Sequence, residues 1–171
     1  MLPTEKLSPA DAAILETFVV PRYLSLFGEL AQQMLVVGES ARILHLGCRT
    51  GYPDLKIYEH SDGAEMVGVD ASLPALELAR NKAQVRGDVR IEYRPSSDDS
   101  LAGEEGLYTH ALTLHPNVGA DDRLLLLSEM ERMLCSGGQV VSFSPAAKKT
   151  GTLMLPAVVM VVRQLFPMMV R

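Results

Sequence analysis

The sequence contains no tryptophan and only two cysteines, Cys48 and Cys135, among its 171 residues. Two cysteines in unrelated contexts do not make a disulfide framework, and free thiols are typical of proteins kept in a reducing compartment. The residues before Ser8 are charged and include Pro3, so they lack the apolar core of a secretory signal peptide. We therefore expect a cytoplasmic protein.

Basic residues are too few and too scattered to form a nucleic-acid surface. Lys and Arg number 16 against 21 Asp and Glu, which gives a net charge of −5. Proteins that bind nucleic acids carry clustered positive charge to neutralise phosphates, so we expect no nucleic-acid partner. The sequence also lacks internal repeats and low-complexity tracts, and its length suits one domain with a real core.

Long apolar runs are scarce, with one exception near the C-terminus. Residues 153–170 contain only two strongly polar side chains, Arg163 and Gln164. The length is borderline for a membrane span, but Pro156 and Pro167 bracket the run, and a charged Arg163 in lipid is costly. We expect an apolar helix in this run, buried or covered by a partner, rather than a membrane segment.

Metal-ligating residues are few as well. His45 and His110 lie on predicted strands that should be neighbours, and His115 lies just beyond one of them. A pair formed by His45 and His115 has no third ligand at a convincing spacing. We therefore predict no metal site.

Short apolar runs alternate with helical patterns along most of the chain. A helical segment begins after the N-cap residue Ser8 and continues to about Leu35, with a kink expected at Pro21. Strands are predicted at residues 42–46, 65–69, 89–93, 107–114 and 139–143, and helices at residues 53–59, 73–86 and 121–135.

These strands are short and nearly all apolar, which is typical of parallel sheets covered by helices on both faces. We predict a Rossmann-like α/β fold, a three-layer sandwich with a mainly parallel sheet of about five strands. Residues 1–38 are expected to form a helical segment packed on the domain of residues 39–171.

Two predicted strand ends carry residues suited to a nucleotide-like ligand. The first strand runs into a turn between Gly47 and Gly51, and such turns let a ligand approach the backbone at a helix start. The second strand ends at Asp70, close to twenty residues beyond the glycines, where a carboxylate can bond ribose hydroxyls. The alternatives are a tight turn without a ligand and an Asp that helps to cap the next helix.

Together these segments resemble the class I S-adenosylmethionine (SAM) methyltransferases. Residues 43–52 read ILHLGCRTGY and are similar to the first motif of that family, and residues 67–70 read VGVD, like its acidic motif. Residues 125–143 resemble its fourth helix, the PGG-like turn and the fifth strand. The resemblance implies the fold of this family and SAM as the cofactor.

The resemblance also assigns roles to single residues. The cofactor-binding residues it implies are Gly47, Cys48 and Gly51 at the methionine part of SAM, Asp70 at the ribose, and Ala71 and Ser72 beside the adenosine. The residues that would face the transferred methyl group are Leu114, His115 and Asn117, and of these His115 and Asn117 are the candidates for catalysis. For His115 a simple turn residue is the alternative.

Several residues depart from the family pattern. His45 stands where the family has an acid, and an imidazole cannot attract the ammonium group of SAM. Arg49 replaces the middle glycine of the first motif, and Pro95 alters the adenine-contacting segment. We also expect the last two strands of the family, the final one antiparallel, to be missing.

We therefore interpret the chain as a methyltransferase-like pseudoenzyme with impaired SAM binding, acting as a protein-interaction or regulatory module. One alternative is an active SAM-dependent methyltransferase acting on a small molecule or a protein. Another is a domain that binds a different nucleotide or an anion through Arg49. Without further strands, residues 139–143 form an exposed sheet edge. We therefore expect a homodimer or another protein partner at the C-terminal apolar helix.

Overall fold

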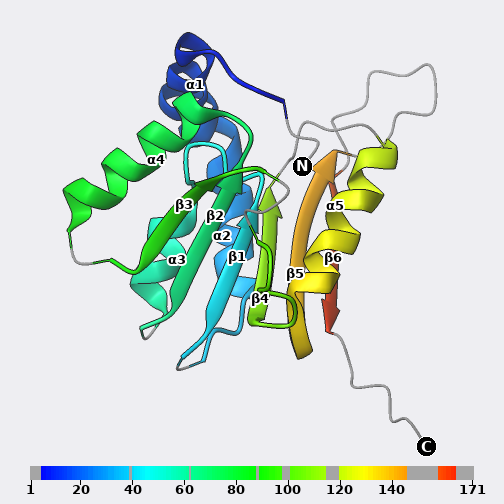
Figure 1. The fold of residues 1–171 in the computed structure, drawn as a ribbon. Helices are drawn as coiled ribbons and strands as arrows, with labels where there is room; N and C mark the ends of the chain where they lie inside the picture. The colour runs from blue at the N-terminus through cyan, green and yellow to red at the C-terminus, as the bar shows by residue number, and fades with distance from the viewer. Residues whose placement is uncertain are drawn as a thin grey trace, which may run out of the picture.

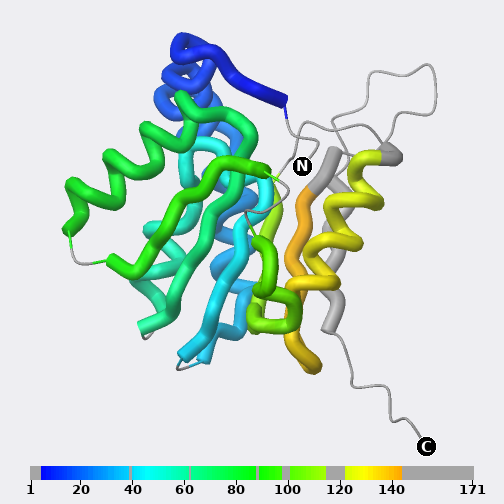
Figure 2. The backbone as a smooth tube through the Cα atoms, viewed as in Figure 1, coloured from blue at the N-terminus to red at the C-terminus, as the bar shows by residue number. Residues whose placement is uncertain are grey.

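The computed structural model of the protein describes residues 5–38, 40–61, 63–87, 89–97, 101–114, 120–145 and 158–164, and Figure 2 traces its backbone. One sheet forms its centre, with the strand order β3-β2-β1-β4-β5-β6. The strands are β1 Arg42–Leu46, β2 Glu65–Asp70, β3 Ile91–Pro95, β4 Tyr108–Leu114, β5 Leu134–Pro145 and β6 Val158–Gln164. Neighbours among β1 to β5 run parallel, which confirms the predicted mainly parallel α/β sheet.

Helices cover both faces of this sheet (Figure 1). They are α1 Pro9–Ile14, the π-helical η1 Leu15–Leu24, α2 Ser25–Met34, α3 Asp54–His60, α4 Leu73–Arg86 and α5 Ala120–Met133. Side chains of successive strand residues point to opposite faces, so Ile43 packs with Phe27 of α2 while Leu44 packs with Met130 of α5. The N-terminal helices therefore belong to the main core.

The N-terminal helical segment changes its helix type around Pro21, where we predicted a kink. Pro21 lies inside η1, which runs for ten residues as a π-helix between α1 and α2. Proline cannot donate the backbone hydrogen bond of a helix and clashes with the preceding turn. A π-helical segment changes the hydrogen-bond pattern around such a residue, so the chain continues as a helix beyond it.

The C-terminal part differs most from the expectation. Within the apolar run, residues Val158–Gln164 form a strand and not a helix, and this strand β6 pairs antiparallel with β5. The strand is rich in valine, which favours a pleated strand over a helix. An antiparallel last strand is therefore present, and β5 is not the exposed edge that we predicted. Among the described residues, no helix is long and apolar enough to cross a bilayer.

Two predicted boundaries also shift. β3 begins at Ile91 rather than Val89, and β5 begins directly after α5, at Leu134 rather than Gln139. The pairing of β4 with β5 changes register between Tyr108 and His110. The pairing passes from Leu134 directly to Gln139, and Gly137 has φ +83°, so the glycines lie in an irregular part of β5 rather than in a turn before it.

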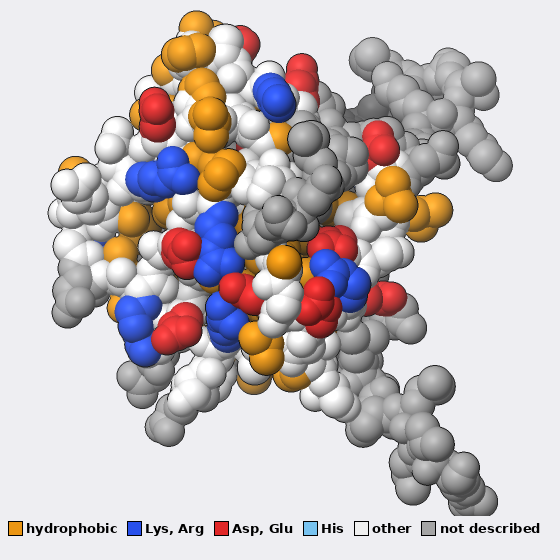
Figure 3. Space-filling view, viewed as in Figure 1, with side chains coloured by type: hydrophobic (Ala, Val, Ile, Leu, Met, Phe, Trp, Pro, Cys, Tyr) orange, Lys and Arg blue, Asp and Glu red, His pale blue; other side chains and the backbone are white. Residues whose placement is uncertain are grey.

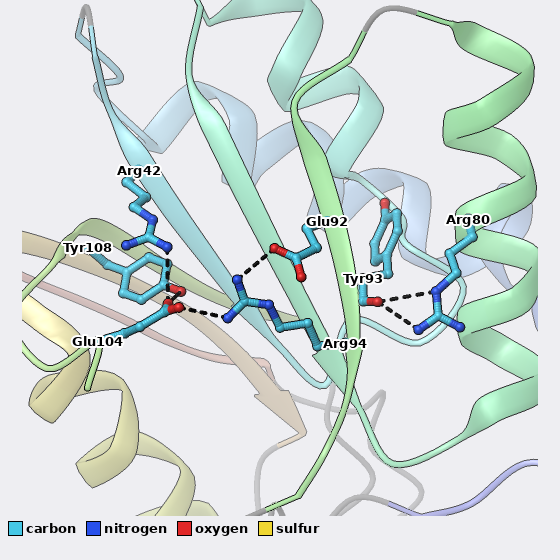
Figure 4. A network of polar contacts seen from close by, with 7 residues as sticks. All are labelled: Arg42, Arg80, Glu92, Tyr93, Arg94, Glu104 and Tyr108. Carbon is cyan, nitrogen blue, oxygen red and sulfur yellow. Dashed lines mark hydrogen bonds and ion pairs between the residues drawn. The ribbon is translucent and has the colours of Figure 1, made fainter. Parts of the chain in front are cut away.

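An ionic network fixes the turn segment that precedes β4. Glu104 of this segment accepts hydrogen bonds from Arg42 at 3.1 Å, from Arg94 at 2.8 Å and from the hydroxyl of Tyr108, and Arg94 also bonds Glu92 at 2.6 Å (Figure 4). Figure 3 shows acidic and basic side chains interspersed on this face. Within the network, each of Arg42, Arg94, Glu92 and Glu104 has an opposite charge beside it.

Arg80 of α4 protects the free edge of the sheet at β3. Its guanidinium donates two hydrogen bonds to the carbonyl oxygen of Tyr93, at 3.2 Å from Nε and 2.7 Å from Nη2 (Figure 4). An unpaired strand edge is a template for unwanted pairing, and this contact occupies one of its carbonyl groups.

Candidate functional site

The candidate site lies at the carboxyl ends of β1 and β2, where open α/β sheets bind their ligands. The turn after β1 contains three residues in the left-handed region, with φ of +69° at Gly47, +52° at Arg49 and +78° at Gly51. The N–H groups of Gly47 and Cys48 both donate to the carbonyl of Val69, at 2.8 and 3.2 Å. These bonds fasten the turn to the end of β2. Arg49 keeps a conformation that costs a residue with a side chain about 1–2 kcal/mol.

Asp70 ends β2, as the sequence predicts, but its carboxylate is turned to the protein. The side chain is fully buried. Oδ1 accepts the N–H of Ser72 at 2.8 Å, and Oδ2 accepts the N–H of Arg49 at 3.1 Å, with the Arg49 Nε atom 3.9 Å away. Burial raises the pKa of Asp70, although the Arg49 charge and the two N–H groups oppose that shift. Both carboxylate oxygens therefore have partners within the chain.

The segment before α1 crosses the same end of the sheet (Figure 1). The carbonyl of Glu5 accepts a hydrogen bond from the Arg49 guanidinium. The hydroxyl of Ser72 accepts the N–H of Leu7 at 3.1 Å and lies 3.2 Å from its carbonyl, to which it donates. Ser72 is 1% exposed and the Arg49 side chain 11%. The segment thus contacts two residues that also bind Asp70.

A buried pair of His45 and Asp54 lies at the position where the family has its first acid. The Nδ1 atom of His45 lies 2.6 Å from Oδ1 of Asp54, the first residue of α3. The other ring nitrogen of His45 and Oδ2 of Asp54 are buried without a hydrogen-bond partner among the described residues. Burial and the nearby Asp54 charge raise the pKa of Tyr93, which places that phenol in the same cluster.

Close packing within the protein requires the glycines around this cluster. A Cβ atom at Gly51 would lie 2.5 Å from the hydroxyl oxygen of Tyr93 and 2.9 Å from Cβ of Ala79. A Cβ atom at Gly68 would lie 2.6 Å from the Tyr93 ring and 3.0 Å from Sγ of Cys48. Tyr93 thus fills the space beside both glycines, which gives them a role in packing.

Of the remaining predicted site residues, Cys48 and Leu114 lie within the described part of the chain. Cys48 is buried, and burial, followed by the charges of Asp54 and Asp70, raises the pKa of its thiol well above the ordinary value. A thiol of this kind is a poor nucleophile. Leu114 ends β4. His115 and Asn117 lie outside the described residues, so their roles stay predictions.

Within the described part of the chain, no group of three or more His, Cys, Asp or Glu side chains is placed to hold a metal.

Sequence reasoning missed three contributors to this site. Asp54 was detectable in part, because an acid is common at the start of a helix, but its pairing with His45 requires the fold. Glu5 and Leu7 contribute mainly through backbone atoms, 44 and 65 residues away in sequence from their partners. Contacts of this type leave no sequence pattern.

Comparison with known proteins defines the class. Residues 43–138, more than half of the chain, match the family described as methyltransferase domain. The chain therefore belongs to the class I SAM-dependent methyltransferase family. Over 111 residues it is 35% identical to the demethylmenaquinone methyltransferase of Thermus thermophilus. The aligned region covers 63% of this chain and 49% of that protein. The chain thus spans about half the length of this curated relative.

Solved structures share the fold at low sequence identity. A SAM-dependent methyltransferase from Aquifex aeolicus superimposes with a TM-score of 0.66 at 14% identity, covering 86% of this chain and 79% of that one. A putative methyltransferase in complex with the Trm112 activator, from Haloferax volcanii, gives 0.65 at 22% identity, covering 80% and 59%. Identities at this level establish the Rossmann-like fold and nothing finer.

Proposed function

We propose that this methyltransferase-fold domain binds SAM poorly or not at all, and that it acts as a protein-interaction or regulatory module. The observation that carries the proposal is the state of Asp70. Its carboxylate is fully buried, and both oxygens accept N–H groups of the chain itself, from Arg49 and Ser72. Each oxygen keeps a lone pair that could accept a ribose hydroxyl, but the carboxylate is fully buried, so a ribose can reach it only if the groups that cover it move.

The position of His45 supports the same conclusion. An acid at this point would attract the ammonium group of SAM, whereas His45 is itself a partner of Asp54 at 2.6 Å. The Asp54 carboxylate is thereby engaged by an imidazole inside the protein. Neither side chain presents free negative charge to a ligand, so recognition of the amino-acid part of SAM is weakened too.

Calorimetric titration of the purified chain with SAM and with S-adenosylhomocysteine tests the proposal. We expect no saturable heat with either ligand up to about 1 mM, which corresponds to a binding free energy weaker than roughly −4 kcal/mol. Micromolar binding of either ligand would overturn the proposal.

An active methyltransferase acting on a small molecule is the second candidate. The observation that favours it is the 35% identity to an enzyme named demethylmenaquinone methyltransferase. This candidate requires the groups that cover Asp70 to move, so that ribose hydroxyls can reach its remaining lone pairs. The same titration separates the two candidates, because an enzyme has to bind SAM before it transfers a methyl group.

We further propose that the partner is a second copy of the chain, bound at the edge of β6. β6 is the last strand in the sheet order, and it is apolar from Val158 to Val162. An apolar edge strand favours pairing with another strand, and two identical antiparallel edges pair about a two-fold axis. Sedimentation equilibrium should give a dimer that Met160→Lys or Val161→Lys converts to a monomer. A monomeric wild-type chain contradicts this part.

A further inference from the structure

We infer that residues 5–7 form a strap across the carboxyl ends of β1 and β2 that keeps adenosine-type ligands away from Asp70. The inference rests on the proposed function, because it supplies a physical cause for weak SAM binding. It adds that the block is a contact of the chain with itself, which can be opened. Figure 1 shows this segment running across the end of the sheet at which the parallel strands finish.

Arg49 and Ser72 each bind both the strap and Asp70. Arg49 binds Asp70 through its backbone N–H, and its guanidinium donates to the Glu5 carbonyl. Ser72 binds Asp70 through its backbone N–H, and its hydroxyl bonds both the N–H and the carbonyl of Leu7. A ligand that reaches Asp70 therefore has to displace the strap or share its partners.

The start of α1 fixes the far end of the strap. Ser8 follows directly and caps α1, accepting the N–H of Asp11 at 3.2 Å. Further along, Glu16 bonds Nζ of Lys82 at 2.8 Å and so ties η1 to α4. Because the helices are anchored in this way, opening the strap needs only rotation of the chain before Ser8, without unfolding of α1.

Hydrogen bonds to Arg49 and Ser72 hold the strap closed. The net contribution of one hydrogen bond within a protein is modest, and its loss changes an equilibrium by roughly five- to ten-fold. A ligand that binds only the open state has its apparent affinity reduced by the fraction of open molecules. Loss of a strap contact should therefore increase ligand affinity by a similar factor.

Two full-length variants test this inference. Leu7→Pro removes the N–H that Ser72 accepts and leaves all site residues unchanged. Ser72→Ala removes the hydroxyl but retains the backbone N–H that binds Asp70. S-adenosylhomocysteine is titrated calorimetrically into each. Hydrogen exchange of the Leu7 amide reports opening in wild type and in Ser72→Ala, since Leu7→Pro lacks this amide. We expect faster exchange in Ser72→Ala, and in both variants saturable binding at least about five-fold tighter than the roughly 1 mM limit expected for wild type. The double variant should gain little more, because both changes remove the same contact.

Ser25→Ala is the matched control, because its hydroxyl bonds only the nearby Pro21 carbonyl, at 3.2 Å, away from the strap. It should match wild type in exchange of the strap and in ligand binding. If the Leu7 amide exchanges faster in Ser72→Ala but neither strap variant binds better than wild type, the inference is overturned while the proposed function stands. If wild type already binds at micromolar concentration, the proposed function falls, and the strap falls with it as a barrier.

Discussion

The Nδ1 atom of His45 lies 2.6 Å from Oδ1 of Asp54, and both side chains are only 1% exposed. This pair stands where a class I methyltransferase keeps its first acid. The acid is not simply lost, since a carboxylate from the start of α3 occupies the same neighbourhood and is bound to the imidazole. Restoring the family residue at position 45 therefore cannot be done in isolation.

His45→Asp should destabilise the protein strongly, by about 3 kcal/mol or more, because it places a second carboxylate against Asp54 without solvent. The reciprocal exchange His45→Asp with Asp54→His rebuilds the pair and should recover more than half of that loss. Urea unfolding of the three variants and wild type gives the free energies. The exposed His60→Asp substitution at the end of α3 is the control and should cost under about 1 kcal/mol. Equal costs at positions 45 and 60 would contradict the coupling.

Gly51→Ala tests the close packing of the turn on Tyr93. It introduces a side chain at φ +78° and a Cβ atom 2.5 Å from the Tyr93 hydroxyl oxygen. Gly103→Ala carries nearly the same backbone penalty at φ +75° but meets no atom within 4 Å. We expect about 1 kcal/mol for Gly103→Ala and at least about 2 kcal/mol more for Gly51→Ala, measured by thermal or urea unfolding. Similar losses of unfolding free energy in the two variants would show that the Tyr93 side chain moves aside at little cost.

Glu104→Gln tests the ionic network before β4. Burial opposes ionisation of Glu104, but hydrogen bonds from Tyr108 and Arg94 outweigh it and lower the pKa of the carboxyl. Its stabilisation is therefore complete above the ordinary value of 4.5 and is lost as the pH falls through the lowered folded value. The variant should lose about 1–2 kcal/mol at pH 7 and show less acid sensitivity than wild type. Urea midpoints between pH 7 and pH 3 measure both effects, with the exposed Glu77→Gln as the control. A variant with the acid sensitivity of wild type would contradict this role of Glu104.

The sequence predicted most of the fold because its signals are local. The predicted strand at Arg42–Leu46 and the helix at Leu73–Arg86 have the bounds that the structure shows. In both, an apolar pattern is bracketed by capping or turn residues. The C-terminal run was predicted wrongly as a helix, because an apolar segment without alternation fits a buried helix and a buried strand equally well.

The candidate site was predicted less well than the fold. Asp70 lies at the end of β2 as expected, because the strand and the spacing determine its place. Its partners were not predictable, since two are backbone N–H groups and the covering strap is distant from Asp70 in the sequence. The orientation of a buried carboxylate depends on tertiary contacts that no local pattern records.

Arg49→Gly tests the balance between backbone strain and side-chain contacts in the turn. Glycine at φ +52° relieves about 1 kcal/mol, while loss of the guanidinium removes its contacts with Asp70 and with the Glu5 carbonyl. The two effects oppose each other, so the free energy of unfolding should change by less than about 1 kcal/mol. Hydrogen exchange of residues 5–7 should nevertheless become faster. A large change in stability without faster exchange would assign Arg49 a purely structural role.

Titration of the wild-type chain with S-adenosylhomocysteine tests the central claim most directly, because it asks whether Asp70 is available to a ribose. The account predicts no saturable binding up to about 1 mM. Binding at micromolar concentration would contradict it, because the internal partners of Asp70 would then have to give way readily to the ligand.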